Sequence, residues 1–219
     1  MAPLEPALRD GLQAATQALG LELTTAQADT LLQYLALLQR WNSTYNLTSV
    51  RDPTEMLSLH LLDCLAVVAP LRRHLGSHGG TRVLDVGSGA GLPGVVIAVL
   101  NPALWVTCVE TVGKKAAFVQ QVAAELALSN LRSAHARVEK LRAAPFDIVT
   151  SRAFASLSDF VKLTRSQLGP SGTWLAMKGK QPVDEVAQLG DDIDVFHVEP
   201  LSVPGLNAER CLVWMKPNA

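Results

Sequence analysis

A glycine-rich loop between two apolar segments is the first place in this sequence where chemistry can be expected. Residues 82–94 read RVLDVGSGAGLPG: a short apolar run ends at closely spaced glycines, and an apolar helical pattern begins at Val95. Glycines allow positive φ and let a ligand approach the backbone closely. The N–H groups at the start of the next helix then face the ligand. The segment predicts a strand, a binding loop and a helix, with a purely structural glycine turn as the alternative.

Two classes of cofactor use such a loop. Read from Gly89, the sequence matches the dinucleotide fingerprint G-x-G-x-x-G. Read from Asp85, it spells D-V-G-S-G-A-G, which resembles motif I of class I S-adenosylmethionine (AdoMet) methyltransferases. We favour the second interpretation because the glycines begin at Gly87, directly where the apolar strand ends. Gly87, Gly89 and Gly91 are then expected to bind the cofactor, and Asp85 to hold the loop through backbone amides or to contact the methionine end through water.

Further polar residues follow the next two predicted strands. Glu110 stands 19 positions after Gly91, where a carboxylate can accept hydrogen bonds from both ribose hydroxyls in either cofactor class. After the third strand, residues 136–139 could frame an adenine with a backbone N–H and a side chain. These positions extend the predicted cofactor site along one edge of the sheet.

The end of the fourth predicted strand bears on the reaction. Residues 146–154 read FDIVTSRAF, without the N-P-P-Y-like run of amino-group adenine methyltransferases or the cysteine of cytosine C5 enzymes. Arg152 would instead reach the site, followed by Phe154 as a stacking surface. Arginine cannot act as a general base, but it can hold a phosphate, a carboxylate or a base edge. A ring nitrogen such as guanine N7 attacks a sulfonium methyl without a base, so alignment supplies the catalysis.

The elements that must position these residues alternate between short apolar runs and helical patterns. That alternation predicts βαβ units and a mostly parallel sheet. The last two runs have no helix between them and should pair antiparallel, whereas a dehydrogenase would continue with βα units. We therefore expect a class I AdoMet-dependent methyltransferase (Rossmann-like) α/β fold, with a seven-stranded mostly parallel sheet and an antiparallel C-terminal hairpin. The predicted strands are 82–86, 105–110, 131–135, 146–150, 172–177, 194–200 and 210–216.

Helical patterns precede the first strand. Residues 1–23 predict a weak helix that stops near Gly20, and Thr24 or Thr25 could cap a second helix that ends at about Asn42.

A third helix is expected over residues 53–68 and places His60 and Asp63 beside its apolar residues. We expect an N-terminal helical extension over residues 1–60, packed on the core, and an AdoMet-binding methyltransferase domain over residues 61–219.

Composition limits the classes of protein to which the chain can belong. Of 219 residues, 48% are apolar and 18% charged, which indicates a globular protein with one good core. Cys64, Cys108 and Cys211 are few and far apart, so neither a disulfide framework nor a metal site is expected. No run looks long and apolar enough to span a bilayer, and the N-terminus lacks a signal-peptide apolar region. A cytoplasmic location, without membrane association, is the default expectation.

Charge is unevenly distributed although the net charge is −1. Residues 132–180 carry nine Lys or Arg against three acids, and residues 184–199 carry six acids without Lys or Arg. The basic half of such a dipolar surface could contact phosphate. Ordinary solvated surface charge is the alternative.

Several motifs together resemble one family. They are W-N-x-x-Y-N-L-T at 41–48, R-D-P at 51–53, D-V-G-S-G-A-G-L-P-G at 85–94, S-R-A-F-A at 151–155 and K-G at 178–179. The combination is similar to the glucose-inhibited division protein B family, whose members are 16S ribosomal RNA guanine-N7 methyltransferases. The resemblance covers roughly residues 40–216.

The resemblance implies roles for individual residues. The positions that match family contacts to AdoMet are Gly87, Leu92, Val138, Glu139 and Arg152. The positions implied on the RNA side or in catalysis are Asn46, His60, Lys114, Arg137 and Lys178. Asn46 and Arg152 would orient the base and offset charge as guanine becomes cationic. Leu59 departs from the family, which has an arginine before the histidine.

The resulting hypothesis is an AdoMet-dependent methyltransferase that acts on the N7 of a guanosine in 16S ribosomal RNA. Its partner would be that RNA or the small ribosomal subunit, and we expect it to act as a monomer. The target base would be exposed or flipped, because a stacked N7 cannot align with the methyl group. Three alternatives stay open: an NAD(P)-dependent oxidoreductase, a non-catalytic RNA-binding or assembly protein with a methyltransferase fold, and a small-molecule methyltransferase.

Overall fold

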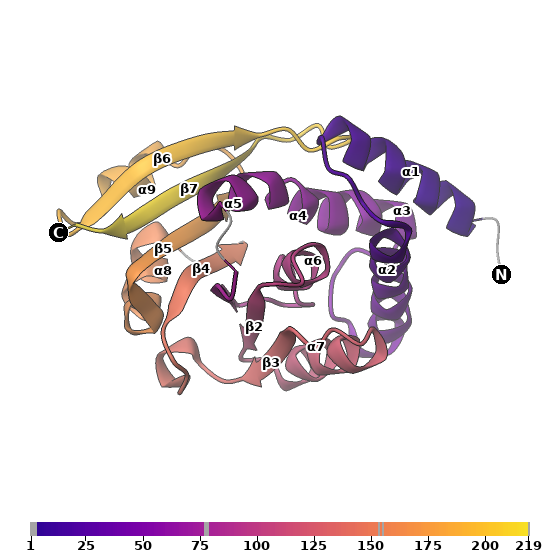
Figure 1. Cartoon of the computed structure of the whole chain (residues 1–219), viewed down its shortest axis with the longest axis horizontal. Helices are drawn as coiled ribbons and strands as arrows, with labels where there is room; N and C mark the ends of the chain where they lie inside the picture. The colour runs from indigo at the N-terminus through magenta and orange to yellow at the C-terminus, as the bar shows by residue number, and fades with distance from the viewer. Residues whose placement is uncertain (1–3, 77–78, 153, 155, 219) are drawn as a thin grey trace.

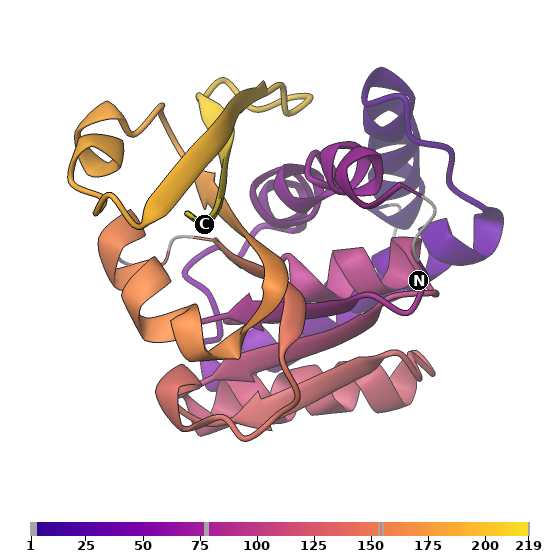
Figure 2. The ribbon, with the colours of Figure 1, turned by 60° about the vertical axis from the view of Figure 1, so that its left-hand side comes forward.

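Seven strands form one sheet at the centre of the computed structural model, which describes residues 4–76, 79–152, 154 and 156–218. The strand order is β3-β2-β1-β4-β5-β7-β6 (Figures 1 and 2). The strands are β1 (Arg82–Val86), β2 (Trp105–Glu110), β3 (Leu131–His135), β4 (Phe146–Arg152), β5 (Leu168–Lys178), β6 (Ile193–Leu201) and β7 (Arg210–Pro217). All seven predicted strands are present.

The first five strands are parallel, and β7 runs antiparallel to both β5 and β6. The predicted terminal hairpin is therefore confirmed. The last four strands, β4 to β7, are longer than predicted. Strand β4 continues to Arg152 because Ser151 and Arg152 pair with Ala176 and Met177 of β5. This pairing places Arg152 at the end of a central strand and not in a loop.

Helices cover both faces of the sheet, which produces two hydrophobic cores. Neighbouring residues of a strand point to opposite faces, so Val83 belongs to the first core and Leu84 to the second. The first core lies under α1 (Leu4–Ala18), α2 (Thr25–Tyr45), the helical run 53–75, α6 (Gly94–Leu100) and α7 (Gly113–Glu125). The second lies under α8 (Leu157–Thr164), with α9 (Val183–Ala187) beside it.

The two N-terminal helices begin and end close to their predicted positions. Thr24 caps α2 with a capping box, in which the Thr24 hydroxyl accepts from the Gln27 N–H and the Gln27 side chain accepts from the Thr24 N–H. Helix α2 ends three residues beyond the predicted Asn42, at Tyr45. Gly20, with a φ of 64°, follows α1 as expected of a helix stop. The division into an extension and a domain at residue 60 stays a prediction.

The third helical run continues past the predicted end at Val68. It consists of α3 (Pro53–Met56), the π-helical η1 (Leu57–Leu62), α4 (Asp63–Leu65) and α5 (Val68–Leu75). Pro70 is compatible with α5 because it lies in the first turn, where backbone N–H groups have no partner within the helix.

By length and composition, the run Pro53–Leu75 could cross a membrane, with a mean hydropathy of 1.4. This contradicts the expectation that no run is apolar enough. In the structure, 67% of its apolar window is buried inside the protein, as in a core helix.

Candidate active site

The glycine loop adopts the predicted conformation. Gly87, Gly89 and Gly91 have φ values of 63°, 57° and 88°, a region in which residues with a Cβ are strained. The Gly87 N–H donates to the Val109 carbonyl at 2.9 Å, which ties the loop to the end of β2. A Cβ on Gly91 would lie 2.7 Å from a Val95 methyl group, so this glycine also lets the loop pack against α6.

Asp85 holds the loop through a backbone amide, one of the two roles expected for it. Its Oδ2 accepts a hydrogen bond from the Gly94 N–H at 2.8 Å, at the start of α6. Its Oδ1 is buried and has no hydrogen-bond partner within the described chain. Burial raises the pKa of the Asp85 carboxyl from 3.8 to about 7. A carboxyl group that titrates near neutrality therefore lies directly beneath the loop.

Glu110 lies on the other side of the loop and is also buried. Its two oxygens accept from backbone amides, Oε2 from the Gly89 N–H and Oε1 from the Val112 N–H, both at 2.9 Å. These bonds fix the end of β2 against the glycine loop, where the ends of parallel strands place ligands. The ribose contact of Glu110 stays a prediction, and Glu110 is not among the residues that line the cavity described next.

A cavity of about 680 Å³ opens at the carboxyl ends of β1, β4 and β5. Its lining includes six of the predicted site residues: His60, Gly87, Gly89, Leu92, Arg152 and Lys178. The segment Leu47, Thr48 and Val50 lines it from the α2 side, and Arg210 lines it from β7. The cavity therefore joins the cofactor loop to residues expected on the RNA side.

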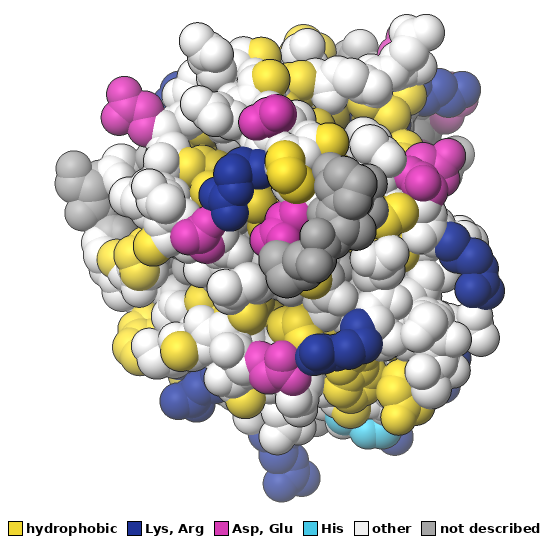
Figure 3. All heavy atoms as spheres, turned by 90° about the vertical axis from the view of Figure 1, so that its right-hand side faces the viewer, with side chains coloured by type: hydrophobic (Ala, Val, Ile, Leu, Met, Phe, Trp, Pro, Cys, Tyr) yellow, Lys and Arg dark blue, Asp and Glu magenta, His cyan; other side chains and the backbone are white. Residues whose placement is uncertain are grey.

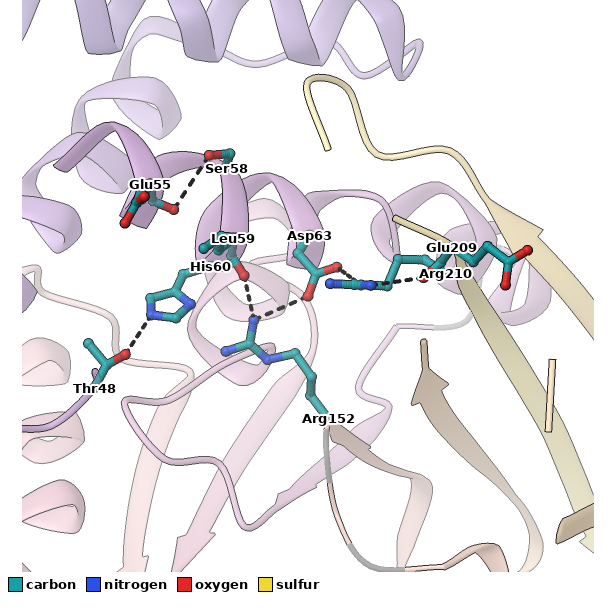
Figure 4. A network of polar contacts seen from close by, with 9 residues as sticks. All are labelled: Thr48, Glu55, Ser58, Leu59, His60, Asp63, Arg152, Glu209 and Arg210. Carbon is teal, nitrogen blue, oxygen red and sulfur yellow. Dashed lines mark hydrogen bonds and ion pairs between the residues drawn. The ribbon is translucent and has the colours of Figure 1, made fainter. Parts of the chain in front are cut away.

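Arg152 is held inside this cavity by a polar network (Figure 4). Its Nη1 donates to the Leu59 carbonyl at 3.1 Å and to Asp63 Oδ2 at 3.2 Å. Asp63 Oδ1 accepts from Arg210 Nε at 2.7 Å. One buried carboxylate thus fixes two guanidinium groups, one from the end of β4 and one from the start of β7.

His60 lies beside this network on the same helical run (Figure 4). Its Nε2 is 2.9 Å from the Thr48 hydroxyl, and its buried Nδ1 has no partner within the described chain. Burial, with a contribution from the Arg152 charge, lowers the pKa of His60. The ring is therefore neutral at neutral pH and joins η1 to the segment after α2.

Three other predicted RNA-side residues, Asn46, Lys114 and Lys178, lie in the cavity lining or next in sequence to residues that line it. Asn46 follows α2 in a left-handed conformation, with a φ of 49°, and its Oδ1 accepts from Arg51 Nη2 at 2.9 Å. Lys114 Nζ donates to the Tyr45 carbonyl at 2.7 Å, which joins α7 to the end of α2. Lys178 lines the cavity and pairs with Glu185 at 2.7 Å.

The residues after β3 lie outside the cavity lining. Arg137 and Glu139 are exposed, and Val138 is buried in the second core. Their expected contacts with adenine or RNA stay predictions. Within the S-R-A-F-A motif, Ala153 and Ala155 lie outside the described residues, while Phe154 lines the cavity.

Sequence reasoning missed three contributors to the site. Tyr34 of α2 is fully buried and donates its hydroxyl to the Ala90 carbonyl of the glycine loop at 2.8 Å. A tyrosine in an apolar helix stripe was a usable signal, because a buried hydroxyl needs a partner. The sequence pattern places Asp63 on the correct helix but assigns no role to Asp63 or to Arg210.

The strand order, the antiparallel hairpin and the loop geometry define the class I AdoMet-dependent methyltransferase fold. Solved structures with this fold include magnesium protoporphyrin IX methyltransferase from Synechocystis PCC 6803, with a TM-score of 0.61, 16% identity and coverage of 84% of this chain and 97% of that one. TrmN from Thermus thermophilus matches with a TM-score of 0.56, 17% identity and coverage of 74% and 53%. At these identities the similarity establishes the fold alone.

Sequence comparison gives the family. Residues 27–213 match the GidB family model, described as rRNA small subunit methyltransferase G. Proteins named ribosomal RNA small subunit methyltransferase G are 62% identical in Leptothrix cholodnii, over 96% of each chain, and 59% identical in Acidovorax ebreus, over 99% of this chain and 96% of that one. The chain belongs to the rRNA small subunit methyltransferase G family, as the sequence motifs indicated.

Proposed function

We propose that this protein transfers the methyl group of AdoMet to the N7 of a guanosine in 16S ribosomal RNA. The observation that carries the proposal is the single cavity that joins the glycine loop to Arg152, Lys178 and the segment after α2. Family membership supports the RNA substrate, since the relatives are named for the ribosomal small subunit. A cavity that joins the loop for the methyl donor to several basic side chains is suited to a large anionic substrate.

The residues present fit the cofactor. The positive φ of Gly87 and Gly89 brings backbone close to the cavity, and the buried Asp85 Oδ1 beneath it has no hydrogen-bond partner among the described residues. We expect Glu110 to hold the ribose and Val138 with Glu139 to frame the adenine. When bound, AdoMet supplies an electrophilic sulfonium methyl group.

The protein's own contribution to catalysis is alignment and exclusion of water. Arg152 is fixed by Asp63 and the Leu59 carbonyl, so its remaining N–H groups can orient a guanine through O6, which leaves N7 free to attack. Because Arg152 is itself a cation, it cannot offset the positive charge that develops on the base. The Asp63 carboxylate is already balanced by Arg152 and Arg210, so that role falls to the amide oxygen of Asn46.

The remaining residues proposed for RNA binding are His60, Lys114, Arg137 and Lys178. The cations would hold phosphates that flank the target, and neutral His60 would contact the nucleotide by hydrogen bonding. We also expect the protein to act as a cytoplasmic monomer on the small subunit or its RNA.

The test uses purified protein with methyl-labelled AdoMet and small ribosomal subunits from cells that lack this gene. N7-methylguanosine is located by borohydride reduction followed by aniline cleavage of the RNA. We expect label at one guanosine of 16S RNA and cleavage at that position. Label without cleavage would contradict the N7 assignment, and absence of label on subunits and on naked 16S RNA would contradict the proposal.

A further inference from the structure

A ladder of aromatic rings runs from the first core to the surface at the end of α2. Phe118 of α7 is fully buried and packs edge-on against Trp41, with ring centroids 5.5 Å apart. Trp41 packs against Tyr45, with centroids 5.1 Å apart and planes inclined by 39°. Tyr45 is 46% exposed. Its ring is therefore supported from behind while part of it faces solvent.

The ladder ends beside the cavity. Tyr45 is the last residue of α2, and Leu47 and Thr48, which line the cavity, follow within three residues. Two residues span at most about 7 Å, so Tyr45 lies at the cavity mouth. The Lys114 bond to the Tyr45 carbonyl fixes this position against α7, and Lys115 lines the cavity.

Three cations lie on the segments next to Tyr45. Lys114 bonds the Tyr45 backbone, Lys115 follows it, and Arg51 is held by Asn46, the residue after Tyr45. On the face formed by α1 and α2, by contrast, side chains of both charges are scattered among apolar ones (Figure 3). An aromatic face next to several cations matches the chemistry of a nucleobase with its flanking phosphates.

Other exposed aromatics among the described residues lack this setting. Trp105 is 51% exposed but begins β2, at the edge of the sheet opposite the cavity. Phe196 is 41% exposed on β6, the edge strand of the sheet, where it lies beside His74 and Lys216. Unlike Tyr45, neither stands beside a segment that lines the cavity that holds Arg152.

We propose that Tyr45 is a stacking platform for the unpaired RNA base next to the target guanosine, with Arg51, Lys114 and Lys115 on the adjoining phosphates. The inference rests on the proposed function and adds a specificity-determining contact to it. A guanosine that leaves its stack exposes the face of a neighbouring base, and an aromatic ring replaces the lost partner. Tyr45 offers that ring where the RNA enters.

The experiment measures the affinity of the full chain for two probes, naked 16S RNA transcribed in vitro and small subunits from cells that lack this gene. The variants are Tyr45→Ala, Tyr45→Leu and Tyr45→Phe, with Trp105→Ala as the matched exposed aromatic far from the cavity. Tyr45→Leu retains apolar contact with Trp41, so it keeps the test valid if Tyr45→Ala fails to fold. The KM and kcat of methylation are measured on the same samples.

Loss of the ring should weaken binding to the better probe between about fivefold and a hundredfold, the range of one base–aromatic stack. KM should rise by a similar factor, while Tyr45→Phe and Trp105→Ala stay within twofold of wild type. The salt dependence of binding should not change in Tyr45→Leu, because stacking releases no counterions.

The inference would be overturned by a Tyr45→Leu variant that binds as wild type does, or by a Tyr45→Phe variant that binds as weakly as Tyr45→Leu. Failure of wild type to bind either probe would overturn it as well. Binding without methylation by wild type would instead contradict the proposed function, and the affinities of the variants would still decide the role of Tyr45.

Discussion

Arg152 and Asp63, which both line the cavity, form an ion pair of 3.2 Å, with side chains 22% and 5% exposed. The carboxylate of Asp63 also binds Arg210 at 2.7 Å, so it fixes two cations from strands on either side of β5. A guanidinium held in this way has little freedom to move when a base enters. Asp63 is therefore the residue that positions Arg152.

Removal of Asp63 should destabilise the protein. Asp63→Ala leaves two guanidinium groups without their buried partner, and we expect a loss of about 3 kcal/mol in the free energy of unfolding. Urea unfolding monitored by circular dichroism measures it. The control is Asp29→Ala, which breaks the exposed Arg9–Asp29 pair of 2.7 Å, with both side chains 42% exposed, and should cost less than about 1 kcal/mol. Equal losses in both variants would show that the buried network stabilises the fold no more than an exposed ion pair does.

The glycine loop should tolerate a side chain poorly at Gly91. In Gly91→Ala, positive φ costs about 1–2 kcal/mol, and the new Cβ meets methyl groups of Val95 and Val119 at 2.7 and 3.0 Å. We expect lower stability and loss of AdoMet binding in calorimetric titration. Gly20→Ala is the matched control, because Gly20 also has positive φ but has open space around it. It should lose about 1 kcal/mol and bind AdoMet normally; AdoMet binding by Gly91→Ala equal to wild type would contradict the loop assignment.

Asp85 should make stability depend on pH in the direction opposite to ordinary acids. Its pKa is about 7 when folded and near its ordinary 3.8 when unfolded, so the folded state retains the proton more strongly. The contribution of Asp85 to the free energy of unfolding is fully present below pH 3.8 and is lost as the pH rises to about 7. The loss is on the order of 4 kcal/mol. Asp85→Asn, which keeps an oxygen for the Gly94 N–H, should remove this loss. The measurement is the difference between the two proteins in unfolding free energy at pH 4 and pH 7.5, and a constant difference would refute the assignment.

The fold was largely predictable from local patterns, because apolar periodicity and glycine placement determine strands, loops and caps within a few residues. The contacts that assemble the site were not. Asp63 and Arg210 are 147 positions apart and Tyr34 and Ala90 are 56 apart. Such pairs depend on how the helical run 53–75 and α2 pack on the sheet, and local propensity carries no information about that packing. The π-helical turn that presents the Leu59 carbonyl to Arg152 was likewise not anticipated.

Arg137 should bind RNA through a phosphate although it lies outside the cavity lining. Arg137→Ala is expected to weaken binding to 16S RNA and to lower the slope of log K against log salt by about 0.7, the value for one single-strand phosphate contact. The control is Arg132→Ala, which removes an exposed cation from β3, five residues before Arg137. This variant should leave the slope unchanged. Equal slopes for wild type and Arg137→Ala would remove Arg137 from the RNA side of the site.

Mass mapping of methylated guanosines in 16S RNA from cells with and without this gene is the decisive test of N7 methylation by this protein. One N7-methylguanosine should disappear on deletion and return with the wild-type gene, but not with an Arg152→Ala variant expressed at the same level. A methylation map that is unchanged after deletion would show that the protein does not methylate 16S RNA.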